Sequence, residues 1–401
     1  MDYPTVRLKA GRERPLLAGH PWLFSGALQP LPASIAPGDV VNVVTARGEW
    51  VARGYLNPAN SLALRILTTD ATEAIDTAFF ARRITQAAAL RASLPAHATN
   101  AYRLIHAEGD FLPGLIVDCF DRWLVAQIHT AGMERQREPI VAALRQVMAP
   151  EGILLRTDMG VRARESLPVG AAEVTWGQVP AEITIQEAGI HYLVDPYHGQ
   201  KTGFFLDQRD KRARIRACAN AAHTLLNCFA YSGAFALAGL AANPALRTIN
   251  VDASKPALDL ARRNYTLNGH DPTSPAHIFA AEDVGAYLKA AGEAAERFDI
   301  VIVDPPAFAK TQENKRRALY GYETLNTLAS RVVAPGGHLL TCSCTGVVDL
   351  PEFEATVHAA LLHARRRAQL LASYTVSLDH PTLPGFPEDR YLKALLLHIV
   401  A

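Results

Sequence analysis

Cysteine is scarce in this chain, which has five cysteines among 401 residues. Their odd number and irregular spacing exclude a disulfide framework or a zinc knuckle, and they fit a reducing compartment better than an oxidising one. The first residues, Met1 to Pro4, lack the charged and apolar regions of a signal peptide, and no stretch approaches about 18 uninterrupted apolar residues. We therefore expect a cytoplasmic protein that neither spans a membrane nor holds a metal ion.

Excess charge is also missing, since the formal net charge is +1 and the isoelectric point about 7.8. This balance neither favours nor excludes a nucleic-acid partner, because phosphate groups are bound by local basic clusters and not by the total charge. Hydrophobic residues make up 49% of the chain and charged residues 20%, so global disorder is excluded. The length predicts two or three domains with sizeable cores.

The first 70 residues contain short β-prone runs separated by turn residues. Val40–Val44 and Leu62–Leu67 are such runs, and Pro37–Asp39 precedes the first of them. The pattern predicts a small β-barrel over residues 1–70. The block 71–194 mixes both kinds of element and is expected to form a central α+β domain. Its expected helices lie at 72–92 and 135–149, and its expected strands at 114–118, 123–129, 153–156 and 182–194.

From about residue 195 onward, strands and helices alternate. Strands are expected at 223–229, 248–251, 277–280, 298–303 and 338–343, and helices at 234–242, 255–268, 284–295, 315–333 and 352–371. Strands that alternate with helices of this length are typical of βαβ units and a parallel sheet. We therefore predict an α/β protein whose last domain, 195–401, has a Rossmann-like fold.

A candidate nucleotide site follows the first of these strands. Leu225–Gly233 is an apolar strand that runs into a turn, where doubly wound sheets bind nucleotides. Asp252 ends the next strand, 19 residues after Gly233, and an acid at this spacing accepts both ribose hydroxyls. The turn has one glycine and no dinucleotide fingerprint, so a nucleoside cofactor without phosphates is favoured. An ordinary βαβ turn would show the same pattern.

Two further strand ends carry acidic residues. Glu282–Asp283 follows the third strand, where a carboxylate could accept from an adenine amino group. Asp304–Pro306 follows the fourth strand, and its prolyl bond fixes the loop with the Asp304 carboxylate facing the crevice. Together with Asp252, this arrangement resembles the class I methyltransferases, which use S-adenosylmethionine.

A cysteine follows the last expected parallel strand. A lone cysteine is usually a small buried residue, but Cys344 lies beyond the apolar stretch, within Ser343–Gly346, which favours exposure. Carbon 5 of a pyrimidine takes a methyl group only after a thiolate has added to carbon 6. Methylation of a nitrogen needs no such sulfur. Cysteine at this strand end therefore favours carbon methylation.

The motifs together resemble one family in particular, the bacterial ribosomal RNA large subunit methyltransferase I enzymes, which make 5-methylcytosine in 23S ribosomal RNA. The similarity extends in weaker form over the whole chain. The matching segments are Lys201–Arg209, Asn227–Gly233, Val251–Asp252, Asp304–Phe308, Ser343–Gly346, His380–Pro381 and Tyr391–Lys393.

The resemblance implies roles for individual residues. Cys344 is the nucleophile, and Asp304 pairs with the cytosine edge and supports protonation at N3. Ala307 stands where wider relatives carry a second cysteine, so the base that removes the C5 proton is unassigned. Cys342 is the alternative nucleophile, because strand alternation puts both sulfurs on one face. The residues expected to line the S-adenosylmethionine pocket are Phe204, Gln208, Phe229, Ala230, Tyr231, Ser232, Gly233, Asp252, Asp283 and Asp304.

The N-terminal segment resembles a PUA domain, a small RNA-binding β-barrel, at Gly19–Phe24, Pro37–Val41 and Ala52–Tyr55. Trp22 and Phe24 could equally be core residues, so the binding prediction rests on this resemblance and on nearby basic residues. A base in a stem must be unstacked to reach the crevice, so a single-stranded or flipped target is expected.

Basic residues near these motifs are candidates for contact with RNA. The expected RNA-binding residues are Arg7, Lys9, Lys201, Arg209 and Lys310, with Arg12, Arg14 and the runs 211–216 and 315–317 as further candidates. Solvated helix faces carry similar runs, and Arg365–Arg367 is expected to be such a surface on the last helix.

Other functions remain open at this point. A uracil-C5 methyltransferase also needs a cysteine, whereas a guanine-N methyltransferase would leave Cys344 idle. A non-catalytic ribosome-assembly factor could retain the fold, although the presence of Gly233, Asp252, Asp304 and Cys344 together argues against it. The expected partner is ribosomal RNA, free or partly assembled, and a homodimer is allowed.

Overall fold

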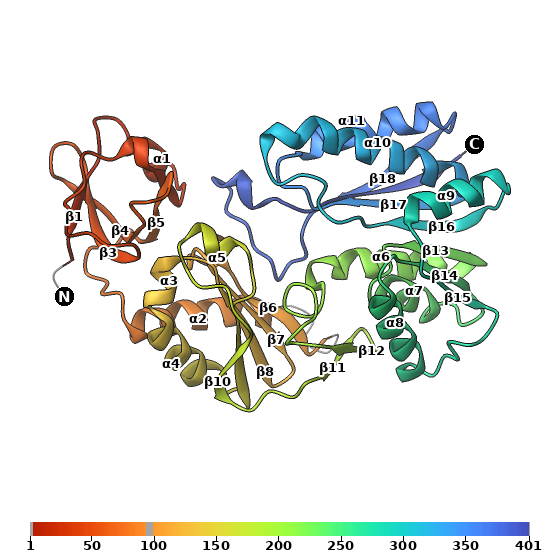
Figure 1. The fold of residues 1–401 in the computed structure, drawn as a ribbon, viewed down its shortest axis with the longest axis horizontal. Helices are drawn as coiled ribbons and strands as arrows, with labels where there is room; N and C mark the ends of the chain where they lie inside the picture. The colour runs from red at the N-terminus through yellow and green to blue at the C-terminus, as the bar shows by residue number, and fades with distance from the viewer. Residues whose placement is uncertain (1–2, 94–98, 401) are drawn as a thin grey trace. The chain divides into compact units, whose positions relative to one another are not determined.

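The computed structural model describes residues 3–93 and 99–400, and the chain folds into two compact units (Figure 1). The first comprises the residues up to Ile185 together with Val194–Leu206 and Leu378–Asp389, and the second comprises Gln186–Leu193, Asp207–Ser377 and the residues from Arg390 onward. No helix within the described residues is long and apolar enough to cross a membrane. The three domain ranges expected from the sequence stay a prediction.

A five-stranded sheet forms the N-terminal part of the first unit. Its strands lie in the order β1-β3-β4-β5-β2, with β1 parallel to β3 and the other pairs antiparallel. Alternate side chains such as Val41 and Val43 are completely buried, as expected for the inner face of a small barrel. The elements are β1 (Thr5–Arg7), α1 (Arg14–Leu17), β2 (Trp22–Phe24), β3 (Asp39–Val44), β4 (Trp50–Leu56) and β5 (Leu62–Thr68).

A second five-stranded sheet completes the first unit, in the order β10-β9-β8-β7-β6. Apolar residues of helices α2 and α4 form one core with this sheet. The helix expected at 135–149 is α4, and a further short helix, α3, precedes it and meets it at Gln136. The elements are α2 (Thr77–Ala92), β6 (Ala101–His106), β7 (Leu115–Phe120), β8 (Trp123–Ile128), α3 (Ala131–Arg135), α4 (Arg137–Met148), β9 (Gly152–Arg156), α5 (Val161–Arg164) and β10 (Glu173–Gly177).

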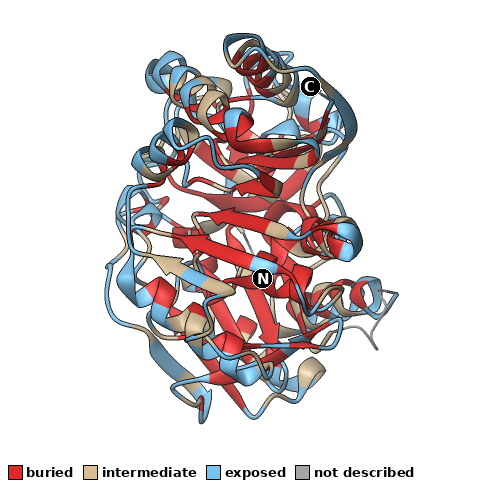
Figure 2. Cartoon of the chain, turned by 90° about the vertical axis from the view of Figure 1, so that its right-hand side faces the viewer, coloured by how far each residue is buried: buried red, intermediate tan, exposed pale blue. Residues whose placement is uncertain are grey.

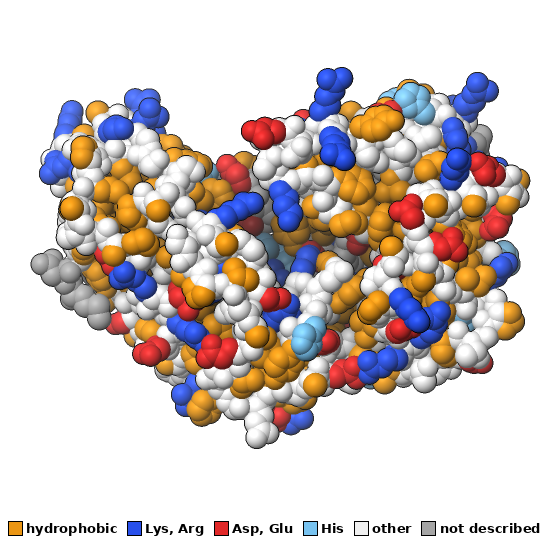
Figure 3. Space-filling model, in the orientation of Figure 1, with side chains coloured by type: hydrophobic (Ala, Val, Ile, Leu, Met, Phe, Trp, Pro, Cys, Tyr) orange, Lys and Arg blue, Asp and Glu red, His pale blue; other side chains and the backbone are white. Residues whose placement is uncertain are grey.

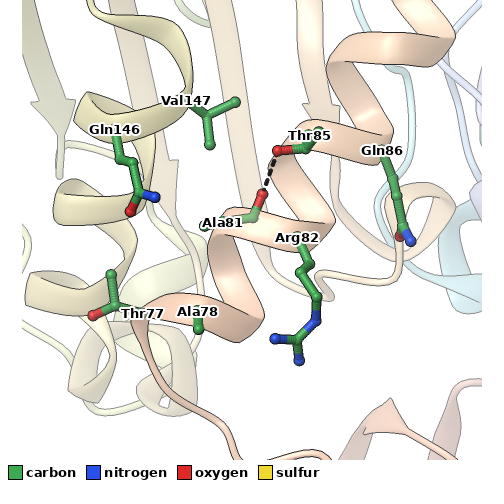
Figure 4. A pocket seen from close by; sticks show the side chains of 8 residues that line it. All are labelled: Thr77, Ala78, Ala81, Arg82, Thr85, Gln86, Gln146 and Val147. Carbon is green, nitrogen blue, oxygen red and sulfur yellow. Dashed lines mark hydrogen bonds between the residues drawn. The ribbon is translucent and has the colours of Figure 1, made fainter.

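An open pocket of about 960 Å³ lies between helices α2 and α4 (Figure 4). Thr77, Ala81, Thr85 and Gln146 are among its lining residues, and Arg82 is its one charged lining residue. Because no carboxylate, imidazole or thiol lines this pocket, it offers no group for acid–base chemistry and no base to activate its threonine hydroxyls.

The segment Leu378–Asp389 packs onto the rest of the first unit through buried polar contacts. The Arg91 guanidinium donates to the Asp379 carbonyl at 2.9 Å, and the Arg103 backbone N–H donates to the Asp379 carboxylate at 3.0 Å. The Phe386 ring lies 4.5 Å from the Trp22 ring, centroid to centroid. These contacts join parts of the chain that are more than 270 residues apart.

Gly109 is in close contact with this segment, and its substitution tests the packing. A Cβ at residue 109 would overlap the carbonyl oxygen of Pro381. We expect Gly109→Ala to lower the free energy of unfolding by about 1–3 kcal/mol, the usual cost of overpacking. Gly26→Ala is the matched control, because nothing lies within 4 Å of a Cβ there. Equal urea midpoints for the two variants would contradict the packing described above.

The second unit contains a seven-stranded sheet in the order β15-β14-β13-β16-β17-β19-β18. The strands from β15 to β17 are parallel, and β19 is antiparallel to both of its neighbours. This confirms the Rossmann-like α/β domain. The elements are α6 (Arg209–Cys218), β13 (Thr224–Cys228), α7 (Ala234–Leu240), β14 (Arg247–Val251), α8 (Lys255–Leu267), β15 (His277–Ala280), α9 (Val284–Glu293), β16 (Phe298–Val303), α10 (Lys315–Val332), β17 (Val333–Ser343), α11 (Leu350–His363), β18 (Ala368–Tyr374) and β19 (Lys393–Ile399).

Two of the expected elements are wrong. The helix expected at 352–371 ends at His363, and the residues from Ala368 form the edge strand β18 because they pair with β19. Arg365 therefore lies in the connection, with a left-handed φ of 56°, and not on a helix. The strand expected at 182–194 is two strands, β11 (Ile183–Glu187) and β12 (Ile190–Val194), joined by a tight turn.

Burial follows these elements. Figure 2 shows that the sheets consist largely of buried residues, whereas the outward helix surfaces are exposed. The core of the second unit includes Cys228, Val303, Tyr322 and Phe353. The strand ends described next are therefore held by well-packed strands.

Candidate functional site

The carboxyl ends of four parallel strands meet at one edge of the seven-stranded sheet. The register pairs Cys228 of β13 with Val251 of β14 and with Val303 of β16, and it pairs Val303 with Thr341 of β17. The loops after these strands therefore begin side by side. Ligands of doubly wound sheets bind at such an edge.

The turn after β13 has an unusual backbone. Phe229, Tyr231 and Gly233 have positive φ values of 58°, 45° and 73°. A Cβ at Gly233 would lie 3.1 Å from the Ala261 side chain on α8, so the glycine serves both the turn and the approach of that helix. Gly233 also closes the turn, because its N–H donates to the Ala230 carbonyl at 2.8 Å.

The Asp252 carboxylate lies next to this turn. It accepts from the Tyr231 N–H at 3.0 Å and from the Ser254 N–H at 2.8 Å, and the residue is half-buried. These bonds use two of the roughly four acceptor sites of a carboxylate. The remaining sites are enough to accept a hydrogen bond from each of the two ribose hydroxyls. The chemistry of this site thus suits an adenosine cofactor.

Other residues expected in the cofactor pocket are also placed by the second unit. Ala230 and Ser232 are buried, and the Ser232 carbonyl accepts from the Asn264 side chain at 2.9 Å. Asp283 is exposed and caps helix α9, where its carboxylate accepts from the Ala286 N–H at 2.9 Å. Capping occupies one of its oxygens, and its proposed contact with adenine stays a prediction.

Asp304 follows β16 and is held by Gln208, which precedes helix α6. The Gln208 side-chain N–H donates to the Asp304 carboxylate at 2.8 Å, and Gln208 is 3% exposed. Two residues that the sequence assigned to one site, 96 positions apart, are therefore in direct contact.

The two cysteines of β17 and its following turn differ in exposure. Cys342 is completely buried, and burial together with the nearby Asp304 carboxylate raises the pKa of its thiol well above the usual value. Cys344 lies one residue beyond the end of β17 and is partly exposed, with its Sγ 3.8 Å from the Pro305 carbonyl oxygen. The strand alternation expected from the sequence stops at Ser343, so the two sulfurs do not share an environment.

Thr345 fixes the turn that carries Cys344. Its hydroxyl accepts from the Phe308 backbone N–H at 3.1 Å and lies 2.7 Å from the Tyr322 hydroxyl. The loop after β16 and the turn after β17 are therefore joined directly at the residue that follows Cys344.

Lys393 is a functional candidate that the sequence reasoning left without a role. It is 2% exposed, and its Nζ donates to the Thr345 carbonyl at 2.7 Å and to the Tyr391 carbonyl at 2.8 Å. Burial lowers the pKa of Lys393 to about 8, while the Cys344, Asp349 and Glu352 charges act in the opposite direction. The signal in the sequence was a lysine at the start of an otherwise apolar strand.

The basic run of helix α6 is largely structural. The guanidinium groups of Arg209 and Arg212 pair with the Glu187 carboxylate at 3.0 and 2.6 Å. The Lys211 Nζ is buried and donates to the Asp207 carbonyl at 2.6 Å. Most of this run is therefore unavailable for phosphate contact, although the expected role of the partly exposed Arg209 stays a prediction.

The other expected RNA contacts are exposed basic residues. Arg7 and Lys9 donate to the carbonyls of Ala46 and Gly26, both at 3.0 Å. Lys310 is exposed in the loop before α10, and in the first unit the Lys201 Nζ lies 4.5 Å from the centre of the Phe205 ring. Their roles in binding stay predictions.

Aromatic residues of the first unit differ in exposure. Phe204, expected in the cofactor pocket, is 2% exposed. Trp22 is half-buried and donates to the Glu108 carboxylate at 2.8 Å, whereas Phe24 is exposed. The alternative of a core role therefore applies to Trp22 and not to Phe24.

The strand order and the acidic strand ends define the class of this protein as a class I methyltransferase that depends on S-adenosylmethionine. Residues 103–396 match the family model described as an S-adenosylmethionine-dependent methyltransferase, and residues 6–69 match a PUA-like domain.

The chain belongs to the ribosomal RNA large subunit methyltransferase I family. It is 38% identical over 400 residues to the protein of that name from Salmonella arizonae, covering 100% of this chain and 98% of the relative. It is 39% identical over 399 residues to the Yersinia pseudotuberculosis protein of that name, covering 99% and 100% of the two chains.

Solved structures agree with this fold. A candidate methyltransferase from Streptococcus mutans has a TM-score of 0.83 at 23% identity, over 98% of this chain and 100% of that one. A candidate methyltransferase complexed with SAH has a TM-score of 0.84 at 24% identity, over 99% and 100% of the chains.

Proposed function

We propose that this protein methylates carbon 5 of a cytosine in large-subunit (23S) ribosomal RNA through a covalent adduct at Cys344. The names of the family members and the PUA-like domain support ribosomal RNA as the substrate. One observation carries the carbon-methylation mechanism: a partly exposed thiol lies against the Asp304–Phe308 loop at the carboxyl edge of the sheet. A nitrogen methyltransferase needs no thiol at that position.

Cys344 and Asp304 would share the chemistry on the base. The Cys344 thiolate bonds to C6, and the electron pair of the C5–C6 double bond becomes available at C5 while Asp304 supports the protonated N3. S-adenosylmethionine, when bound, supplies the methyl group. A base then removes the C5 proton, and the C6–sulfur bond breaks to restore the double bond and the thiolate. The neighbouring Lys393 ammonium favours the thiolate form of Cys344.

The cofactor would be held by the turn after β13 and by the residues around it. Asp252 would accept from the ribose hydroxyls, with Gln208, Asp283, Asp304 and Phe204 as further proposed lining residues. Phe229–Gly233 would face the cofactor with its backbone, because its left-handed residues bend the chain at the sheet edge. Arg7, Lys9 and the PUA-like domain would add affinity for RNA, and a homodimer stays a prediction.

Asp252→Ala tests the cofactor site. We expect it to weaken S-adenosylmethionine binding about 10- to 100-fold, because a charged hydrogen-bond acceptor is worth about 1.5–3 kcal/mol. Calorimetry on the purified variant measures this. Asp259→Ala, in helix α8, is the control, since its exposed carboxylate pairs with Arg262 on the same helix. A folded Asp252→Ala protein with normal affinity would exclude Asp252 from the site.

The substrate base is tested by nucleoside mass spectrometry of ribosomal RNA from a strain that lacks the gene. Loss of 5-methylcytosine from 23S ribosomal RNA, restored by the wild-type gene, is the expected result. Loss of a methylated uridine or guanosine instead would identify the uracil-C5 or guanine-N alternative.

A further inference from the structure

A small hollow lies beside the loop that follows β16. Its volume is about 450 Å³, within the usual range of ligand sites, and Phe308, Asn314, Arg317 and Gly321 line it. It therefore combines an aromatic ring, an amide and a guanidinium group on the loop and the start of helix α10.

The Phe308 ring in this hollow is fixed and yet accessible. It is 37% exposed, and its centroid lies 4.5 Å from that of Tyr322, whose ring is completely buried. A Cβ at Gly321 would lie only 3.1 Å from the Phe308 ring, so a glycine there lets the ring sit close against the helix. A phenylalanine that is held on one side and open on the other is suited to stack with a planar ligand.

The hollow is connected to the candidate nucleophile through one hydrogen bond. The Phe308 backbone N–H donates to the Thr345 hydroxyl, and Thr345 directly follows Cys344. A ligand on the Phe308 ring would therefore lie next to a base that had reached Cys344.

We propose that this hollow binds the nucleotide next to the target base in the RNA strand, with its base stacked on Phe308 and its phosphate on Arg317. The inference rests on the proposed RNA substrate and deepens it. A target base that leaves the stack exposes the face of its neighbour, and an aromatic ring at that point restores the lost stacking. Arg317 is exposed on helix α10. A guanidinium group binds a phosphate through two parallel hydrogen bonds, so Arg317 is suited to this contact.

The distribution of positive charge bears on how RNA would bind at this hollow. On the face of the molecule drawn in Figure 3, Lys and Arg side chains are scattered among acidic ones and do not form a single continuous patch. Lys315, which begins α10, pairs with Glu352, so it is already engaged. Affinity at this place therefore depends on the combination of ring and guanidinium and not on a dense positive surface.

Two pocket variants and two matched controls on α10 test the site. Phe308→Leu removes the flat ring but keeps an apolar contact for Tyr322, and Arg317→Met removes the charge from an exposed position. Tyr320→Leu and Arg331→Met are the controls, because Tyr320 is 71% exposed, Arg331 is exposed at the other end of α10, and neither lines the hollow. Binding of an unmodified 23S ribosomal RNA transcript is measured over a range of salt concentrations, with S-adenosylmethionine binding by calorimetry as the check of folding.

We expect Phe308→Leu to weaken RNA binding about 5- to 100-fold with an unchanged salt dependence, as for loss of one stacked base. Arg317→Met should weaken binding and reduce the slope of log affinity against log salt by about 1. Both controls should bind like the wild type.

The outcomes separate this proposal from the proposed function. If the wild type binds and methylates the transcript while Phe308→Leu and Arg317→Met bind it equally well, the nucleotide site is wrong and the function stands. Equal losses in all four variants would indicate a diffuse surface and also overturn the site. A wild type that neither binds nor methylates the transcript would refute the proposed function itself.

Discussion

Cys344→Ser is expected to reduce methyl transfer by at least about 1,000-fold while leaving S-adenosylmethionine affinity unchanged. A serine hydroxyl is a far weaker nucleophile than a thiolate at neutral pH, and loss of a covalent nucleophile commonly costs this much or more. Single-turnover assays with labelled S-adenosylmethionine measure the rate, and calorimetry measures the affinity. Near-normal turnover in a folded Cys344→Ser protein would refute the adduct mechanism.

Cys342→Ser is the matched control for this experiment. A hydroxyl in the completely buried position of Cys342 costs stability, about 1–3 kcal/mol if it finds no partner, but it leaves the nucleophile intact. RNA that carries 5-fluorocytosine should trap both the wild type and Cys342→Ser, because fluorine cannot leave C5 as a proton. The adduct, seen by mass spectrometry, should be missing only from Cys344→Ser. An adduct at residue 342 would reverse the assignment.

Lys393→Met is expected to slow both methyl transfer and alkylation of Cys344 by iodoacetamide about tenfold near pH 7. The charges of the buried Lys393 ammonium and the Cys344 thiolate attract each other, and each tenfold change in thiolate fraction corresponds to about 1.4 kcal/mol. Methionine keeps a long apolar side chain in the buried position. The substitution therefore removes only the charge and the two hydrogen bonds to carbonyl oxygens.

The pH profile separates this electrostatic role from a merely structural one. The pKa of Lys393 is about 8, so the residue is charged below that pH and loses its charge above it. Wild type and Lys393→Met should therefore differ most at pH 6–7 and converge above pH 8, where the lysine is neutral. The Asp349 and Glu352 carboxylates, whose charges also act on Lys393, are present in both proteins. A difference that stays constant with pH would indicate that Lys393 only supports the turn.

Most elements of the methyltransferase domain were predictable because each depends on local patterns. Alternation of apolar strands with amphipathic helices predicts the parallel sheet, and the observed β13, β14, β15 and β16 lie within one or two residues of the expected ranges. Edge strand β18 was not predictable in this way. Its residues from Ala368 onward have exposed side chains and no distinctive period, and their conformation is set by pairing with β19, some 25 residues further along.

The chemistry of the candidate site was predictable from residue types at strand ends. Asp252, Asp304 and Cys344 each follow an apolar strand, and parallel strands must bring their carboxyl ends to the same edge. Their order along the chain was therefore enough to predict that they lie at the same edge of the sheet, and the class of the protein followed from this pattern.

The availability of particular side chains was decided only by the tertiary structure. The sequence alone could not decide between Cys342 and Cys344. In the structure they differ in exposure, because Cys342 is buried within β17 whereas Cys344 follows the end of that strand and is partly exposed. The sequence made Lys211 a candidate for phosphate contact, but its side chain is completely buried in the structure. Lys393 reaches the turn after Cys344 because β19 returns beside β17, and its hydrogen bond to Thr345 joins residues 48 positions apart. Burial and long-range pairing depend on which surfaces meet, and local sequence carries little of that information.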